Sequence, residues 1–479
     1  MVFNSLQFLI FLPVVLLVNY ILPKKVRYLW LLISSYYFYM CWSAKYALLI
    51  AFSTVVTYFC GILTEKFRKK GAKAVVAASL VINLGILFFF KYFNFTFSIL
   101  GTLLSRLHIA FNAPVIDVLL PVGISFYTFQ ALGYTIDVYR GQIKAERNIF
   151  RYALFVSFFP QLVAGPIERS KNLMSQLEEA KDFSFDNARE GILLMLWGFF
   201  LKIVIADRIA IFVDCVYDAP DTYTGLYLVL ASILFAFQIY CDFAGYSTIA
   251  MGSAKMLGIN LMENFSAPYL SSSVASFWRK WHISLTTWFK DYLYIPLGGN
   301  RKGKIRKYFN KIFVFLVSGL WHGAGISYVI WGGLNGLYQV IAEILTPLRY
   351  RLHLDSKCAL SSLFRGIFTF ILVDFAWIFF RAKSFTEACI VLKNIFIPSS
   401  FDIVSCGLDM PNIILLVVSL LLLLIADIFK SRNICIREKI CHSNATLQIL
   451  IVSVSICAIL LFGIWGPGYD AANFIYFQF

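Results

Sequence analysis

Two of the five histidines, His282 and His322, lie in the segment 276–325, each directly after a tryptophan. Histidine is the side chain that most readily gains or loses a proton near neutral pH, so it can serve as a general base or acid. The same segment contains a basic run and the start of a long apolar run. We therefore take 276–325 as the candidate site.

His322 lies in the run 312–342, which contains no Asp, Glu, Lys or Arg. If a membrane span begins at Lys311, a helical rise puts His322 roughly 16 Å along it. That depth is near the middle of an apolar core about 30 Å thick. An ionisable group at such a depth is costly and indicates a functional site. A histidine that only forms a hydrogen bond across the bundle remains the alternative.

The residues around His282 form a helical stripe. Aromatic and apolar residues recur at intervals of three and four, which predicts one helix with an apolar face. Its members are Trp278, Trp281, Leu285, Trp288 and Tyr292. Such a face suits the boundary between membrane and water. Periodicity alone therefore favours an interfacial anchor helix in which His282 is a satisfied polar residue, with a functional role as the alternative.

Two acidic residues lie in or beside apolar runs. Asp242 follows an expected span that ends at Cys241, and it could orient a histidine or pair with an arginine. Asp374 lies inside the apolar run 365–380 and is expected to be structural, paired with Arg381.

The composition predicts an all-α polytopic membrane protein. Apolar residues make up 60% of the chain, charged residues 14%, and the mean hydropathy is +0.75, whereas a soluble protein has about 25% charged residues. Spans of about 20 residues give about ten to twelve transmembrane helices in one domain. Proline and glycine residues within 118–136 and 150–167 predict interrupted or re-entrant helices there.

The net charge of +16 does not indicate nucleic-acid binding here. Lys and Arg gather in short clusters between the apolar runs, as they do in cytoplasmic loops of membrane proteins. The clusters are 24–27, 66–73, 140–151 and 301–311. The last one could also be a cationic lip that attracts an anionic cytosolic substrate.

Several function classes lack their usual sequence features. The ten cysteines include no Cys-x-x-Cys pair, so we expect neither a metal site nor a disulfide framework. No phosphate-binding loop, dinucleotide fingerprint, zinc-protease motif or serine-hydrolase elbow occurs, which argues against an ATP-driven pump and a soluble-type serine hydrolase.

Five motifs together resemble the membrane-bound O-acyltransferase (MBOAT) family, in its bacterial branch that O-acetylates alginate and peptidoglycan. They are FPQLVAGPI at 159–167, YCDFAGYS at 240–247, the segment 264–301, GLWHGAG at 319–325 and FIYFQF at 474–479. One departure is Thr248, where the family usually has an aspartate.

The resemblance implies a helical bundle around a central funnel, with a core motif region at about 159–345. It also implies that His322 is the essential histidine and that His282 matches a second functional polar position. Because a neutral histidine suits the role of base near pH 7, we expect His322 to be the catalytic base and His282 to position or polarise the donor or acceptor. Further substrate-binding candidates in these motifs are Trp278, Trp281, Trp288, Asp291, Trp321 and Asp242.

The activity implied by the resemblance is transfer of an acetyl group without a metal. The donor is cytosolic acetyl-CoA, and the acceptor is an extracytoplasmic polysaccharide or a secreted partner transferase at a bacterial plasma membrane. Transfer of D-alanyl or another acyl group to a teichoic-type polymer is an alternative. A transporter using His322 as a proton relay, or a non-catalytic scaffold, is another; the inverted repeats expected of many transporters are not visible.

Overall fold

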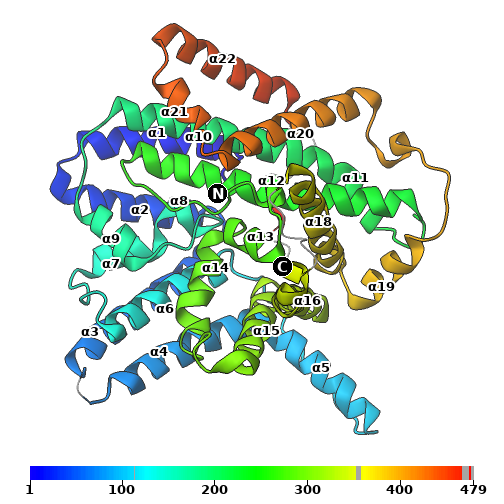
Figure 1. The fold of residues 1–479 in the computed structure, drawn as a ribbon. Helices are drawn as coiled ribbons and strands as arrows, with labels where there is room; N and C mark the ends of the chain where they lie inside the picture. Colours follow the sequence, from blue (N-terminus) through cyan, green and yellow to red (C-terminus); the bar gives the residue numbers. More distant parts are fainter. Residues whose placement is uncertain (69, 113, 352–357, 466–473, 476–479) are drawn as a thin grey trace. The chain divides into compact units, whose positions relative to one another are not determined.

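The computed structural model describes the chain except for residues 69, 113, 352–357, 466–473 and 476–479. All regular structure in the described residues is helical (Figure 1). The chain forms two compact units. Unit 1 comprises Met1–Ile192 and Ala250–Met262, and unit 2 comprises Leu193–Ile249 and Glu263–Phe479.

Unit 1 is built from paired helices near the start of the chain. Its helices are α1 (Leu6–Ile21), α2 (Arg27–Met40), α3 (Ala44–Lys66), α4 (Ala72–Leu87), α5 (Phe93–Arg106), α6 (Ile124–Arg140), α7 (Ile149–Ser157), α8 (Phe159–Leu162) and α9 (Ser170–Glu178). The predicted interruptions are confirmed. Gly123 has a positive φ of 74° before α6, and Phe158 separates α7 from α8.

Unit 2 contains most of the remaining chain. The helix α10 (Phe185–Phe199) leads into it and continues through the π-helical turn η3 (Phe200–Ala206). Its other helical elements are α11 (Asp207–Tyr217), most of α12 (Leu226–Met256), η4 (Pro268–Leu270), α13 (Val274–Lys280), α14 (Ile283–Phe289), η5 (Lys290–Tyr294), α15 (Gly303–His322), α16 (Ile326–Ile344), α17 (Thr346–Arg351), α18 (Ala359–Arg381), α19 (Phe385–Asn394), η6 (Ile403–Cys406), α20 (Met410–Ser431), α21 (Ile436–Cys441) and α22 (Ala445–Phe462).

The fold confirms the all-α polytopic class. Among the described residues, six helical segments are long and apolar enough to cross a membrane. They are Ala44–Lys66, Ala72–Arg106, Leu226–Met256, Leu360–Arg381, Met410–Ser431 and Ala445–Phe462. The apolar helix α1 is shorter. The protein is therefore a multi-pass membrane protein, and the larger count of ten to twelve spans stays a prediction.

Three sequence expectations differ from the structure. The span expected to end at Cys241 continues as α12 to Met256, so Asp242 lies within a helix. The stripe around His282 is not one helix, because α13 ends at Lys280 and α14 begins at Ile283. The uncharged run 312–342 forms two antiparallel helices, α15 and α16, which lie side by side in Figure 1.

Candidate active site

His322 is the last residue of α15, at the closed end of the α15–α16 hairpin. Glycines allow the two helices to approach closely. A Cβ on Gly319 would lie 2.2 Å from the carbonyl oxygen of Tyr328, and one on Gly332 would lie 2.2 Å from that of Phe315. The backbones therefore touch where a side chain would separate them, which fixes the position of His322.

Ion pairs link α15 to α16 at the open end of the hairpin. Glu343, near the end of α16, accepts hydrogen bonds from Lys307 and Lys311 near the start of α15, the latter at 2.6 Å. The hydrogen bond to Glu343 raises the pKa of Lys307. The hairpin therefore has its charged residues at one end and His322 at the other, roughly 16 Å along α15 from Lys311.

His282 sits at the corner between α13 and α14. Its backbone is left-handed, with φ 43° and ψ 55°, a conformation that costs a residue other than glycine of the order of 1–3 kcal/mol. Asn264 holds this corner. Its backbone oxygen accepts from the N–H of Ile283 at 3.0 Å, and its side-chain oxygen accepts from the N–H of Ser284 at 3.3 Å.

The same Asn264 ties the corner to helix α12. Its side-chain nitrogen donates to the hydroxyl of Ser247 at 3.2 Å, and Asn264 itself is only 1% exposed. A buried amide with both ends satisfied specifies a single geometry. Asn264 is therefore a positioning residue for His282.

We expect Asn264→Ala to lower acyl transfer by up to about 100-fold, because a displacement of about 1 Å at a reacting group can cost that much. Turnover and thermal unfolding of the purified protein measure the effect. Asn83→Ala is the matched control, since Asn83 is equally buried and hydrogen-bonds Ser53 and the Ser79 backbone in unit 1. An equal loss of turnover in both variants would contradict a positioning role.

The two histidines face one interior site. Their ring centroids are 6.3 Å apart, and the side chains are buried, with His282 at 0% and His322 at 3% exposure. Burial lowers the pKa of His282 to about 3, so its imidazole is neutral at physiological pH. The structure thus brings together the two histidines that the sequence placed in separate helices.

Aromatic rings surround the pair. Trp321 lies 5.9 Å from His282 and 4.9 Å from His322, centroid to centroid. His322 also contacts Trp331 at 5.0 Å and Phe380 at 5.4 Å. These rings exclude water and lower the local dielectric, which strengthens any hydrogen bond to a reacting group.

Trp278 and Trp281 belong to the next layer of this cluster. The indole N–H of Trp278 donates to Asn335 at 3.1 Å, and its ring lies 5.7 Å from Trp331. Trp281 packs on Trp377 at 5.1 Å. Both tryptophans are buried in unit 2, so the stripe expected at a membrane boundary instead supports the histidine pair.

The other candidates lie on separate parts of unit 2. Trp288 packs on Tyr292 at 4.9 Å, and Asp291 is half-buried in the turn η5 that follows α14. Asp242 faces Lys202, with its Oδ1 2.6 Å from the ammonium nitrogen.

The expected pairing of Asp374 with Arg381 is wrong. Asp374 accepts from the hydroxyl of Ser232 at 3.0 Å, and Arg381 pairs with Asp214 at 2.7 Å. Arg381 lies two helical turns beyond Asp374 on α18, and its guanidinium is paired instead with Asp214 of α11.

Sequence reasoning also missed Asn264, Asn335 and Lys202. Asn264 opens a motif segment and could have been noticed as a polar residue before an aromatic run. Asn335 lies in the uncharged run, and Lys202 is a cation inside an apolar run. No group of three or more described His, Cys, Asp or Glu residues could hold a metal ion.

Comparison with known proteins agrees with this site. The model of the MBOAT, membrane-bound O-acyltransferase, family matches residues 140–382, which include both histidines. The chain is 40% identical over 389 residues to a probable alginate O-acetylase of Pseudomonas putida, covering 80% of this chain and 78% of that protein.

Two further relatives act on different polymers. A peptidoglycan O-acetyltransferase of Helicobacter pylori is 34% identical over 427 residues, covering 82% of this chain and 79% of that protein. A teichoic acid D-alanyltransferase of Bacillus subtilis is 26% identical over 273 residues, with coverage of 55% and 69%. The chain therefore belongs to the membrane-bound O-acyltransferase family and is an O-acyltransferase of the membrane.

Proposed function

We propose that the protein transfers an acetyl group from cytosolic acetyl-CoA to a hydroxyl group on the far side of a bacterial plasma membrane. The acceptor is an extracytoplasmic polysaccharide or a secreted transferase that passes the group on. The whole chain acts as one MBOAT domain. The observation that carries the proposal is the buried pair of histidines, 6.3 Å apart, at the closed end of the α15–α16 hairpin. The names of the relatives support acetyl as the group transferred.

His322 is the general base in this proposal. A neutral ring nitrogen of His322 removes the proton of the acceptor hydroxyl as its oxygen attacks the thioester carbonyl carbon. A carbon–oxygen bond forms, and collapse of the tetrahedral intermediate breaks the carbon–sulfur bond. The proton then passes from His322 to the departing thiolate, which leaves as the CoA thiol. A thioester is already activated, so the step balances without a metal.

His282 binds and polarises the substrates. Its neutral ring can donate one hydrogen bond, and a donor aimed at the carbonyl oxygen stabilises the negative charge that develops there. Trp321, which contacts both histidine rings, forms a wall of the acyl site, and Trp278 and Trp281 support this wall from the next layer. Trp288 and Asp291 remain candidate substrate contacts in this proposal.

The donor approaches from the open end of the hairpin. Lys307 and Lys311 are occupied by Glu343. Four other cations beside them are exposed, and none has an ion-pair partner among the described residues; they are Arg301, Lys302, Lys304 and Arg306. We name these four the cationic lip. Phosphate groups of a nucleotide-bearing donor would be attracted to it.

We expect replacing all four lip residues with glutamine to raise the KM for acetyl-CoA about tenfold or more at low salt while leaving kcat unchanged, because steering depends on charge. The difference should shrink as ionic strength rises. Steady-state kinetics at two salt concentrations measure it. The matched control neutralises four exposed cations where α3 ends and α4 begins, namely Lys66, Arg68, Lys70 and Lys73. Equal KM values in the two variants would count against a donor-binding lip.

The test of the proposed function is acyl transfer by the purified protein. Radiolabelled acetyl-CoA, the protein in lipid nanodiscs and candidate polysaccharides are incubated, and labelled product is counted. We expect label to move to an O-ester. Transfer from a D-alanyl donor with none from acetyl-CoA would favour the teichoic-type alternative. The name of the relative in Bacillus subtilis, a teichoic acid D-alanyltransferase, is the reason for testing this donor. Proton flux without any acyl turnover would favour a transporter and overturn the proposal.

A further inference from the structure

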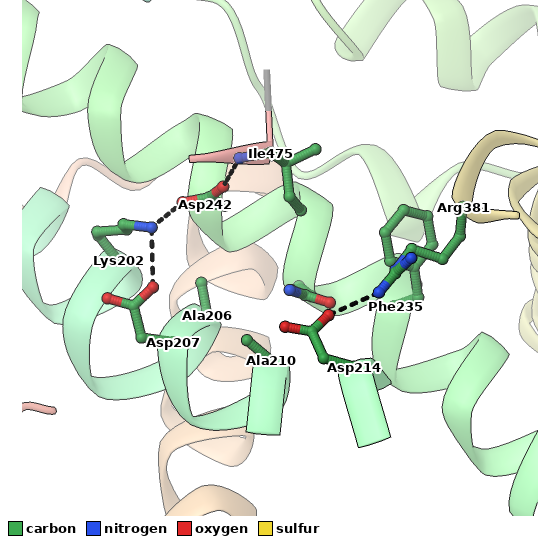
Figure 2. Close-up of a pocket in the computed structure, with 10 residues that line it drawn as sticks. Lys202, Ala206, Asp207, Ala210, Asp214, Phe235, Asp242, Arg381 and Ile475 are labelled. Atoms are coloured by element: carbon green, nitrogen blue, oxygen red, sulfur yellow. Dashed lines mark hydrogen bonds and ion pairs between the residues drawn. The ribbon is translucent and has the colours of Figure 1, made fainter. Parts of the chain in front are cut away.

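A buried group of three charges lies in unit 2, on η3, α11 and α12. Lys202 is 1% exposed, and its ammonium nitrogen lies 2.8 Å from Asp207 and 2.6 Å from Asp242, as Figure 2 shows. One cation thus faces two carboxylates in a medium of low dielectric. Such an arrangement is stable only when the remaining oxygens also receive hydrogen bonds.

Besides its ion pair with Lys202, Asp242 accepts a hydrogen bond from a residue near the C-terminus. The main-chain N–H of Ile475 donates to its Oδ2 at 2.8 Å, and Figure 2 shows this contact opposite Lys202. Hydrogen bonds from a neutral donor to an ionised acceptor are about twice as strong as neutral ones. Both oxygens of Asp242 are therefore engaged in holding other parts of the protein.

The residues bonded there are packed inside unit 2. Phe474 is 0% exposed and Ile475 is 6% exposed. The ring of Phe474 lies 4.2 Å from Tyr246, one helical turn beyond Asp242 on α12. After α22, the N–H of Ile464 also donates to the carbonyl of Ile203 in η3 at 3.0 Å.

This docking position is next to the histidine pair. The Phe474 ring lies 6.4 Å from Phe243, and Phe243 lies 4.7 Å from His282, centroid to centroid. A single phenylalanine ring thus separates the docked segment from His282. Because interiors are close-packed, loss of Phe474 would leave Phe243 and His282 without support on that side.

We infer that Asp242, which is paired with Lys202, is a positioning residue that docks the C-terminal segment at Phe474 and Ile475 as one wall of the catalytic site. This inference rests on the proposed function, because it assigns His282 a part in acyl transfer. It gives Asp242 a task other than substrate binding. It also predicts that the chemical step depends on the hydrogen bond donated by the main-chain N–H of Ile475.

The test removes that hydrogen bond without removing a side chain from α12. Ile475→Pro deletes the N–H donor, whereas Ile475→Val keeps it. We expect Ile475→Pro to lower kcat at least about tenfold, since small displacements at a reacting group are costly, with the KM for acetyl-CoA unchanged. Ile475→Val should keep the wild-type kcat. Both are measured on the full chain in nanodiscs, per folded protein as judged by thermal unfolding.

A second pair of variants keeps the test decisive if Ile475→Pro does not fold. Asp242→Asn keeps the side-chain volume but weakens the hydrogen bond from the N–H of Ile475. It should lower kcat by a larger factor than it changes the KM for acetyl-CoA. Asp214→Asn is its control, because Asp214 lines the small pocket that Lys202 and Asp242 also line, but it pairs with Arg381. Wild-type kcat in Ile475→Pro, or equal loss in the two Asp variants, would overturn the inference. Absence of transfer by the wild-type protein would instead be a failure of the proposed function.

Discussion

His322→Ala is expected to fold, to insert into the membrane and to reduce acyl transfer by about 100-fold to 10,000-fold, the usual contribution of a general base. His322 ends α15 and its ring fills a gap between Trp331 and Phe380, so alanine removes the base and leaves the glycine contacts of the hairpin intact. The measurement is labelled acetyl transfer by the purified variant, with thermal unfolding to verify the fold.

His282→Ala should be impaired less completely than His322→Ala, because His282 assists rather than removes the proton. His108→Ala is the matched control, since His108 is exposed in unit 1 after α5. Acetylation at the wild-type rate in His322→Ala would contradict the assignment of His322 as the general base. A larger loss in His282→Ala than in His322→Ala would reverse the two roles.

The helical class and the two histidines could be predicted from the sequence, because both depend on composition and on local motifs. The hairpin could not. The run 312–342 is uniformly apolar, and nothing in its periodicity marks a turn after His322. In the structure Gly323 takes an extended backbone and Gly325 precedes α16, and the close contacts of Gly319 and Gly332 hold the two helices together.

The break at His282 was missed for a related reason. Spacings of three and four persist through Trp278, Trp281 and Leu285, because one left-handed residue changes the chain direction without changing the order of apolar residues. The corner is stabilised by Asn264, which lies outside the stripe. Helical periodicity reports local preference only, whereas this corner depends on a loop and on Ser247 of α12.

Lys202 is buried between the carboxylates of Asp207 and Asp242. We expect Lys202→Met to destabilise the protein by about 3–5 kcal/mol, the usual cost of removing one partner from a buried ion pair. The methionine has a similar length, so the main change is that two carboxylates lose their shared cation. Thermal or denaturant unfolding in detergent measures the difference.

Two comparisons isolate the charge from the packing. Lys383→Met breaks the exposed pair with Asp218, whose side chains are 59% and 56% exposed, and should cost no more than about 1 kcal/mol. Adding Asp207→Asn and Asp242→Asn to Lys202→Met should recover much of the lost stability, since it removes the uncompensated charges. If Lys202→Met were as stable as Lys383→Met, the buried group would not be a stabilising anchor. If the triple variant recovered stability but not turnover, the charges would serve the docked C-terminal segment rather than the fold.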